Sequence, residues 1–170
     1  MATSRRLAIL LTTSAQAAKA LGTLDAIIQG LKEHGWIEGQ NFTFEYRFAD
    51  GKMDALLRLA AELVRLQVDA IVTDSTPAIQ ALKNATQTVP IVAICNDPVA
   101  SGFASSLGRP GGNITGISLL SADLTGISLS FLCVSEEQGT LHIERPSLKT
   151  SSATCRGFAA ILARRRKQDA

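Results

Sequence analysis

Residues 68–78 read VDAIVTDSTPA, a short apolar run followed at once by the start signal of a helix. The run Val68–Thr73 contains a single charged residue, which is typical of a strand buried on both faces of a sheet. Ser75 or Thr76 then supplies a hydroxyl N-cap, and Pro77 stands at an early helical position. A buried strand that leads directly into a capped helix is the repeating unit of a parallel α/β sheet.

The same alternation extends on both sides of this stretch. Further strands are predicted at Leu7–Thr12, 42–48, Val89–Cys95 and Ile114–Leu119. One helix should bury Leu21, Leu24, Ile27, Ile28 and Leu31, and a helix over 53–66 should bury Leu56, Leu57, Ala60, Leu63 and Val64. A brief helix is expected near 98–107. The pattern predicts an α/β fold: a doubly wound parallel sheet with helices on both faces, a three-layer sandwich.

This pattern stops near Gly126, and the composition changes at the same place. The chain has 170 residues, of which 46% are hydrophobic and 19% charged, which excludes a disordered chain. Residues 1–126 carry 10 Lys and Arg against 11 Asp and Glu, whereas residues 127–170 carry 7 against 4. We therefore expect a domain over 1–126 and a divergent tail over 127–170, in which Phe131–Val134 is a candidate strand.

The N-terminus allows two interpretations. Arg5 and Arg6, the apolar run Leu7–Leu11 and an Ala-x-Ala site at 15–17 resemble a secretory signal. However, Thr12 interrupts the apolar run after five residues, whereas a signal core needs roughly 7–15. We favour a first strand, so the chain as written is expected to carry no export signal. No apolar run approaches the roughly 18 residues of a membrane-spanning helix.

In an open parallel sheet, ligands bind beyond the carboxyl ends of the strands. That rule selects three segments rich in small hydroxyl or acidic residues: 12–14, 74–76 and 96–98. A helix N-terminus suits a carboxylate or phosphate, and Ser75 and Thr76 would add hydroxyl donors. Asp97 would accept hydrogen bonds from an ammonium group, so the pattern points to a small zwitterion. The alternative interpretation is that these side chains only cap the helices that follow them.

Enzyme and metal signatures are missing from the sequence. There is no GxGxxG, P-loop or GxSxG motif and no catalytic set, so we expect neither an enzyme nor a bound cofactor. The three cysteines form no CxxC pair, and with two histidines they do not have the spacing of a metal site. Cys95 ends an apolar run and is expected to be a buried thiol. The basic run Arg164–Lys167 is interpreted as a solvated tail, so no nucleic-acid partner is expected.

Several blocks, in order, resemble a known family. They are GWIEGQN at 35–41, LAAELVRL at 59–66, VDAIV at 68–72 with TPA at 76–78, DPVASG at 97–102 and RPGGNITG at 109–116. Over roughly residues 5–126 the chain resembles the substrate-binding proteins of bacterial ABC transporters, in the branch linked to tryptophan and tyrosine. The resemblance implies a periplasmic-binding-protein-like lobe of a receptor that closes on a small ligand, such as an aromatic amino acid. The receptor then delivers that ligand to an ABC permease.

The resemblance also implies which residues face the ligand. By motif these are Ser75, Thr76 and Ala78 after the third strand and Asp97 after the fourth, with Ser14 contributed by the first loop. At Thr76 and Asp97 the resemblance favours ligand binding over capping alone.

Two departures from the family shape further expectations. Family members are exported to the periplasm, whereas this chain as written would stay in the cytoplasm. They also continue with a second lobe after the block LSADLTG at 120–126. We therefore expect only the N-terminal lobe here, with a truncated gene or a frame break after about 127–135. One lobe would supply half a cleft and bind weakly or not at all. The alternative is a stand-alone cytoplasmic ligand-sensing or interaction domain.

Overall fold

The computed structural model describes residues 5–33, 35–95, 97–105, 112–118 and 130–132. In chain order the elements are β1 (Arg5–Leu11), α1 (Ala15–Ala20), α2 (Thr23–Glu33), β2 (Phe42–Phe48), the 3-10 helix η1 (Met53–Ala55), α3 (Leu56–Arg65), β3 (Ala70–Thr73), α4 (Thr76–Ala85), β4 (Ile91–Cys95), β5 (Ile114–Ser118) and β6 (Ser130–Leu132).

The strands form one sheet in the order β2-β1-β3-β4-β5-β6. Strands β1 to β5 run parallel to their neighbours, and β6 pairs antiparallel with β5. The predicted parallel α/β sheet is therefore confirmed. The candidate strand at Phe131–Val134 is present in part, as β6. The predicted boundary near residue 126 and the tail beyond residue 132 lie outside the described residues.

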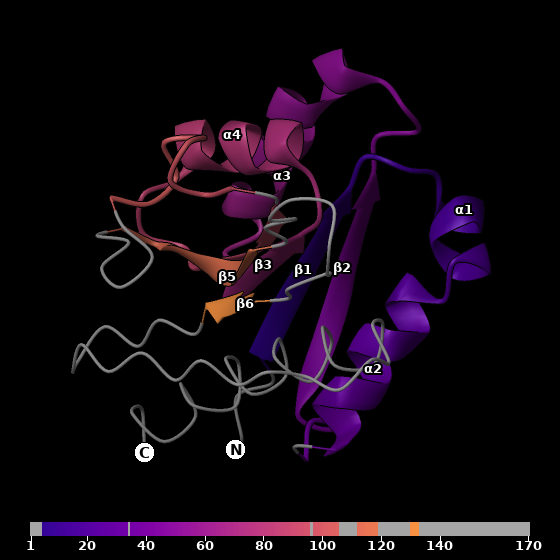
Figure 1. Cartoon of the computed structure of the whole chain (residues 1–170). Coiled ribbons are helices and arrows are strands. Elements are labelled where there is room, and N and C mark those ends of the chain that lie inside the picture. The colour runs from indigo at the N-terminus through magenta and orange to yellow at the C-terminus, as the bar shows by residue number, and fades with distance from the viewer. Residues whose placement is uncertain (1–4, 34, 96, 106–111, 119–129, 133–170) are drawn as a thin grey trace, which may run out of the picture.

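Helices cover both faces of the sheet, with α1 and α2 on one face and α3 and α4 on the other (Figure 1). The central strand β1 divides its side chains between two cores. Leu7, Ile9 and Leu11 pack toward α1 and α2, and Ala8 and Leu10 pack toward α3 and α4. A strand buried on both faces must be apolar at every position, which is why this segment shows no polar alternation. The three-layer, doubly wound arrangement is confirmed.

Two strands begin later than the apolar runs predict. β3 begins at Ala70. Just before it, Asp69 contacts β1 twice: its backbone N–H donates to the carbonyl of Arg6 at 2.7 Å, and its carboxylate accepts the backbone N–H of Arg6 at 2.7 Å. β4 begins at Ile91, and the amide of Asn113 donates to the carbonyl of Val89 at 2.7 Å. In contrast, β1 begins two residues earlier than predicted. Cys95, at the end of β4, is buried as expected.

The first predicted helix is in fact two helices, separated by a turn at Gly22. The N–H of Leu21 closes α1 by donating to the carbonyl of Ala17 at 2.9 Å, and Gly22 adopts a φ of 67°. Leu21 is 72% exposed, so the prediction that it is buried was wrong. The predicted pattern of one buried residue every three or four positions was counted from Leu21, which lies before the turn at Gly22, whereas the rest of the pattern lies in the next helix. Ile27 and Leu31 lie beyond that turn in α2, and both are buried as predicted.

Helix α3 buries Leu56, Leu59, Ala60 and Leu63 against the sheet. Leu57 is 58% exposed, so the prediction that it faces the core was wrong. Neighbouring residues point about 100° apart on a helix, so two adjacent leucines cannot both point at the centre of the interface. Leu59, three positions after Leu56, occupies the buried face instead.

Residues 98–105 form turns where the sequence predicts a brief helix. The N–H of Phe103 donates to the carbonyl of Pro98 at 2.8 Å, and that of Gly102 donates to Val99 at 3.0 Å. Gly102 adopts a φ of 69°, which is incompatible with continuing a right-handed helix. Phe103 is buried in the core under α3 and α4, so the turn is anchored by its side chain.

The edge strand β2 carries aromatic rings along one face, as the alternation at 42–48 predicts. The rings of Trp36, Phe42, Phe44, Tyr46 and Phe48 form a continuous row with centroid separations of 5.9, 4.9, 5.2 and 6.3 Å. They pack on the side of the sheet covered by α1 and α2. The row therefore gives this edge strand an apolar face that is buried at Phe42 and partly buried beyond it.

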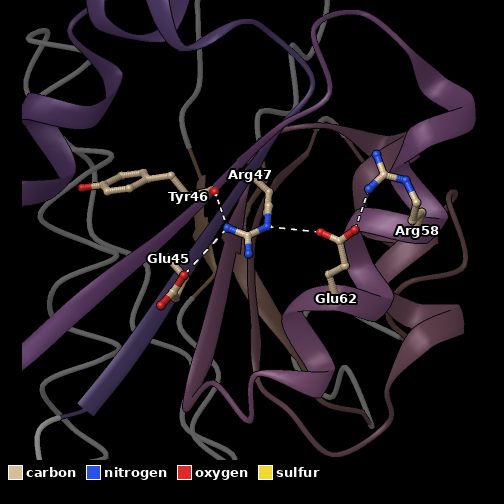
Figure 2. A network of polar contacts seen from close by, with 5 residues as sticks. All are labelled: Glu45, Tyr46, Arg47, Arg58 and Glu62. Atoms are coloured by element: carbon tan, nitrogen blue, oxygen red, sulfur yellow. Dashed lines mark hydrogen bonds and ion pairs between the residues drawn. The ribbon is translucent and has the colours of Figure 1, made fainter.

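A polar network joins the other face of β2 to α3 (Figure 2). The Nε of Arg47 lies 3.4 Å from Glu62 Oε2, and its Nη1 donates to the backbone carbonyl of Tyr46 at 2.7 Å. Two further ion pairs extend the network: Glu45 Oε2 lies 3.7 Å from Arg47 Nη1, and Arg58 Nη1 lies 2.5 Å from Glu62 Oε1. The Tyr46 ring points away from the Arg47 guanidinium, as alternation along a strand requires. Such partly exposed ion pairs contribute about 0.2–1 kcal/mol each, so they orient β2 more than they stabilise it.

Burial, with a smaller contribution from the charge of Glu38, raises the pKa of Tyr46 to about 12. The chain contains one tyrosine, so the ultraviolet absorbance of ionised tyrosine reports this residue alone. We expect a native titration midpoint near 12, against 10.0 in denaturant. Because the folded pKa is the higher one, the corresponding stability is complete below pH 10 and is lost as pH rises toward 12. Glu38→Gln should lower the midpoint only slightly, and a native midpoint near 10 would contradict the burial.

Candidate functional site

The strand order puts a topological switch point between β1 and β3. From β1 the chain passes through α1 and α2 to β2 on one side, and it returns through α3 to β3 on the other. These connections lie on opposite faces of the sheet. In open α/β sheets, ligands bind beyond the carboxyl ends of the strands at such a point. We call the edge where β1 to β5 end the carboxyl edge, and its loops after β1 and β3 are the candidate site.

The loop after β1 contains Ser14, which caps α1. Its Oγ accepts the N–H of Ala17 at 3.1 Å, and its carbonyl accepts the N–H of Ala18 at 2.9 Å. The carbonyl of Thr12 accepts the N–H of Gly51 at 2.8 Å, which ties this loop to the one that follows β2. Ser14 is therefore at the carboxyl edge as predicted, and it has a capping role there.

The loop after β3 contains Ser75 and Thr76 at the start of α4. Of the two predicted N-cap candidates, Ser75 and Thr76, Ser75 is the N-cap, and its Oγ accepts the N–H of Ala78 at 3.4 Å. Thr76 is exposed, and Pro77 follows it within the first turn. Leu10 of β1 is level with Thr73 of β3, so this loop leaves the sheet beside the end of β1.

Ala78 has a different environment from the other predicted contacts. Its side chain is 0% exposed and belongs to the core between α3, α4 and the sheet. Its N–H is directed to the Ser75 Oγ. In this structure Ala78 positions the helix start rather than presenting a side chain at the carboxyl edge.

Asp97 follows β4 and organises the turn beyond it. Its Oδ1 accepts the N–H groups of Val99 at 3.0 Å and of Ala100 at 2.9 Å. One carboxylate oxygen is thus engaged in the fold. A ligand's ammonium group would have to share that oxygen or use the other one.

Asp74 is an acidic residue at the carboxyl edge to which the sequence pattern assigned no role. Its Oδ1 is buried and has no hydrogen-bond partner among the described residues. Burial raises the pKa of this carboxyl, and a hydrogen bond from its own backbone opposes the shift only in part. The signal available in the sequence was an aspartate placed directly after a buried strand.

Two further features, a metal site and a membrane-spanning helix, were considered for the part of the chain that the structure describes. No group of three or more His, Cys, Asp or Glu side chains there is arranged to hold a metal ion. Among these same residues, no helix has the length and apolar character needed to cross a bilayer.

Comparison with known proteins finds similar chains among substrate-binding proteins. The chain is similar to a tyrosine-binding protein of Clostridioides difficile (strain R20291), with 37% identity over 100 residues. That match covers 58% of this chain and 29% of the relative, so the chain spans well under half of that protein.

Three solved structures share the fold. A conserved domain protein from Vibrio cholerae matches with a TM-score of 0.64 and 35% identity, over 70% of this chain and 40% of that one. The ligand-free, open form of a substrate-binding protein with adhesive properties from Clostridium difficile matches with a TM-score of 0.63 and 28% identity, over 69% and 40%. An ABC domain from Streptococcus pneumonia, solved in complex with L-Trp, matches with a TM-score of 0.57 and 24% identity, over 68% and 39%, which shows the fold alone.

A family model described as "ABC transporter substrate binding protein" matches residues 8–130. The match includes every helix and strand described above, apart from residues 5–7 of β1 and residues 131–132 of β6. Since it covers well over half of the chain, this protein belongs to the ABC transporter substrate-binding protein family.

Proposed function

We propose that this chain forms the N-terminal lobe of an amino-acid receptor and that its carboxyl edge holds an aromatic amino acid such as tyrosine. The family is one of binding proteins, and the relative that is 37% identical is named for tyrosine binding. Within the proposal the lobe binds its ligand without transforming it. The complete receptor acts in the periplasm and passes the ligand to an ABC permease.

One observation carries the proposal: small hydroxyl side chains stand at the helix starts on both sides of the switch point. Ser14 begins α1 after β1, and Ser75 and Thr76 begin α4 after β3. The Ser75 Oγ accepts a hydrogen bond from the backbone, so its own proton remains available for donation. With the exposed Thr76 hydroxyl, it offers two donors to a ligand carboxylate at the positive end of a helix. Asp97 stays a predicted contact.

Binding is best tested by amide NMR of nitrogen-labelled protein, because this method detects the weak affinity expected of one lobe. We expect L-tyrosine to shift the amide signals of residues 12–14 and 74–76, and to leave those at the opposite edge of the sheet, such as Asp69, unchanged. L-Lysine serves as a control for a non-aromatic side chain. Absence of any shift at the carboxyl edge with millimolar L-tyrosine would contradict the proposal.

Thr76→Val should lower the affinity for L-tyrosine by about 10-fold or more, because it removes one hydrogen bond to a charged carboxylate. The residue is exposed, so the midpoint of urea unfolding should change little. Thr43→Val is the matched control. Thr43 is also exposed, and it lies near the amino end of β2, opposite Arg6 of β1 and away from the carboxyl edge. Equal affinities of both variants would show that Thr76 does not contact the ligand.

A further inference from the structure

The end of β3 concentrates polar atoms that lack partners. Within the described residues, four buried side-chain polar atoms have no hydrogen-bond partner, and two of them are Thr73 Oγ1 and Asp74 Oδ1, from consecutive residues. Thr73 is 0% exposed. Buried polar atoms in native proteins are nearly always paired, and those left unpaired are common where a ligand supplies the partner. An unpaired carboxylate is the costlier of the two because it carries a charge.

Two other aspartates near the ends of these strands show how the fold treats a carboxylate that it uses itself. Asp69, at the opposite edge, accepts the N–H of Arg6 at 2.7 Å and pairs with the Arg5 guanidinium at 3.1 Å. Asp97 accepts two backbone N–H groups in its turn. Asp74 accepts a hydrogen bond from its own backbone, but its buried Oδ1 has no partner in the described structure. That oxygen is therefore available to a donor that comes from outside the fold.

The residues that follow Asp74 offer complementary groups. Ser75 and Thr76 carry hydroxyl donors at the start of the ten-residue helix α4, where a carboxylate is favoured. An α-amino acid carries its ammonium and carboxylate groups on one carbon atom. An acceptor and two donors on three consecutive residues therefore match the short separation of the two charges in such a head group.

We propose that Asp74, rather than Asp97, is the charged partner of the ligand's α-ammonium group, with Ser75 and Thr76 holding the carboxylate beside it. This assignment rests on the proposed function and specifies its substrate class: the site recognises α-amino acids and discriminates against analogues that lack the amino group. The ammonium provides the hydrogen bonds that Asp74 Oδ1 lacks in the free protein. Binding energy thereby offsets the cost of burying this oxygen without a partner.

A residue that serves binding at the expense of stability has a double signature. Asp74→Asn removes the unpaired charge while keeping the shape of the side chain, so the free protein should unfold at a higher urea concentration at neutral pH. The same variant should lose at least about 30-fold in affinity for L-tyrosine, since the ammonium group loses its charged partner. If Asp74 only supported the fold, its substitution would lower both the stability and the affinity for L-tyrosine, or change neither.

The experiment compares L-tyrosine with desaminotyrosine, which has the same ring and carboxylate but no amino group. Affinities are measured by amide NMR titration for the wild type and for Asp74→Asn, Asp97→Asn and Asp54→Asn. Asp54 is exposed in η1, so the last variant controls for the change in net charge. We expect the wild type and Asp54→Asn to prefer L-tyrosine, and Asp74→Asn to bind the two probes within about threefold of each other.

Each contrary result has a distinct meaning. If the wild type binds neither probe, the proposed function fails and this assignment fails with it. If the wild type binds L-tyrosine and desaminotyrosine equally well, the assignment to an ammonium group is wrong while the receptor function stands. If Asp97→Asn abolishes the preference and Asp74→Asn keeps it, the ammonium partner is Asp97. If Asp74→Asn does not fold, Asp97→Asn decides the assignment: an unchanged preference for L-tyrosine supports Asp74, and a lost preference assigns the ammonium group to Asp97.

Discussion

Gly116→Ala is expected to destabilise the fold by at least about 3 kcal/mol, a large fraction of the stability of a typical domain. Gly116 lies in β5 opposite Ala93 of β4, with a φ of 155°. A Cβ at this position would overlap the carbonyl oxygen of Ala93 and lie 2.7 Å from its backbone nitrogen and carbonyl carbon. Backbone atoms of a neighbouring strand cannot rotate away, so β4 and β5 would have to separate.

Urea unfolding followed by the fluorescence of the single tryptophan, Trp36, measures this effect. Gly112→Ala is the matched control, because a Cβ at Gly112 would meet nothing within 4 Å. We expect that variant to change the free energy of unfolding by less than about 0.5 kcal/mol. Equal effects of the two substitutions would mean that β4 and β5 do not approach as closely as the structure shows.

Leu10→Ala should lower the free energy of unfolding by about 3–5 kcal/mol. Leu10 is 0% exposed in the central strand and packs in the core beneath α3 and α4. Removing its side chain leaves a cavity that strands on both sides of β1 cannot fill without moving. The shift in the urea midpoint, at an unchanged slope, gives the value.

The control for this prediction is Leu57→Ala, the same substitution at a leucine that is 58% exposed. Its cost should be below about 0.5 kcal/mol, although the sequence pattern had placed Leu57 in the core. Comparable losses in both variants would contradict the burial of one leucine and the exposure of the other.

Local signals predicted the elements well and their environments less well. The alternation at 42–48 and the Ser75 cap with Pro77 depend on neighbouring residues only, and both are observed. Leu21 was misplaced because a glycine turn resets the helical phase. At 98–105 turns replace the expected helix, and Phe103 is buried in the core with residues of α3 and α4. Such contacts leave no mark in a window of ten residues.

For the candidate site too, the sequence predicted which residues lie there but not the environment of each one. The rule that ligands bind beyond the strand ends selected Ser14, Ser75, Thr76 and Asp97, and all four lie at the carboxyl edge. The rule could not distinguish the two carboxylates there. Asp97 is engaged by its own turn, whereas Asp74 keeps a buried oxygen without a partner in the described residues, and both facts require coordinates.

The sequence by itself determined the α/β class, the succession of strands and helices, and the resemblance to the receptor family, because periodicity, capping and motifs are properties of neighbouring residues. The tertiary structure alone decided that β1 lies between β2 and β3, and hence that the switch point falls between the loops at 12–14 and 74–76. It also decided which buried polar atoms remain unpaired. These features depend on contacts between residues far apart in the chain, which local propensity does not encode.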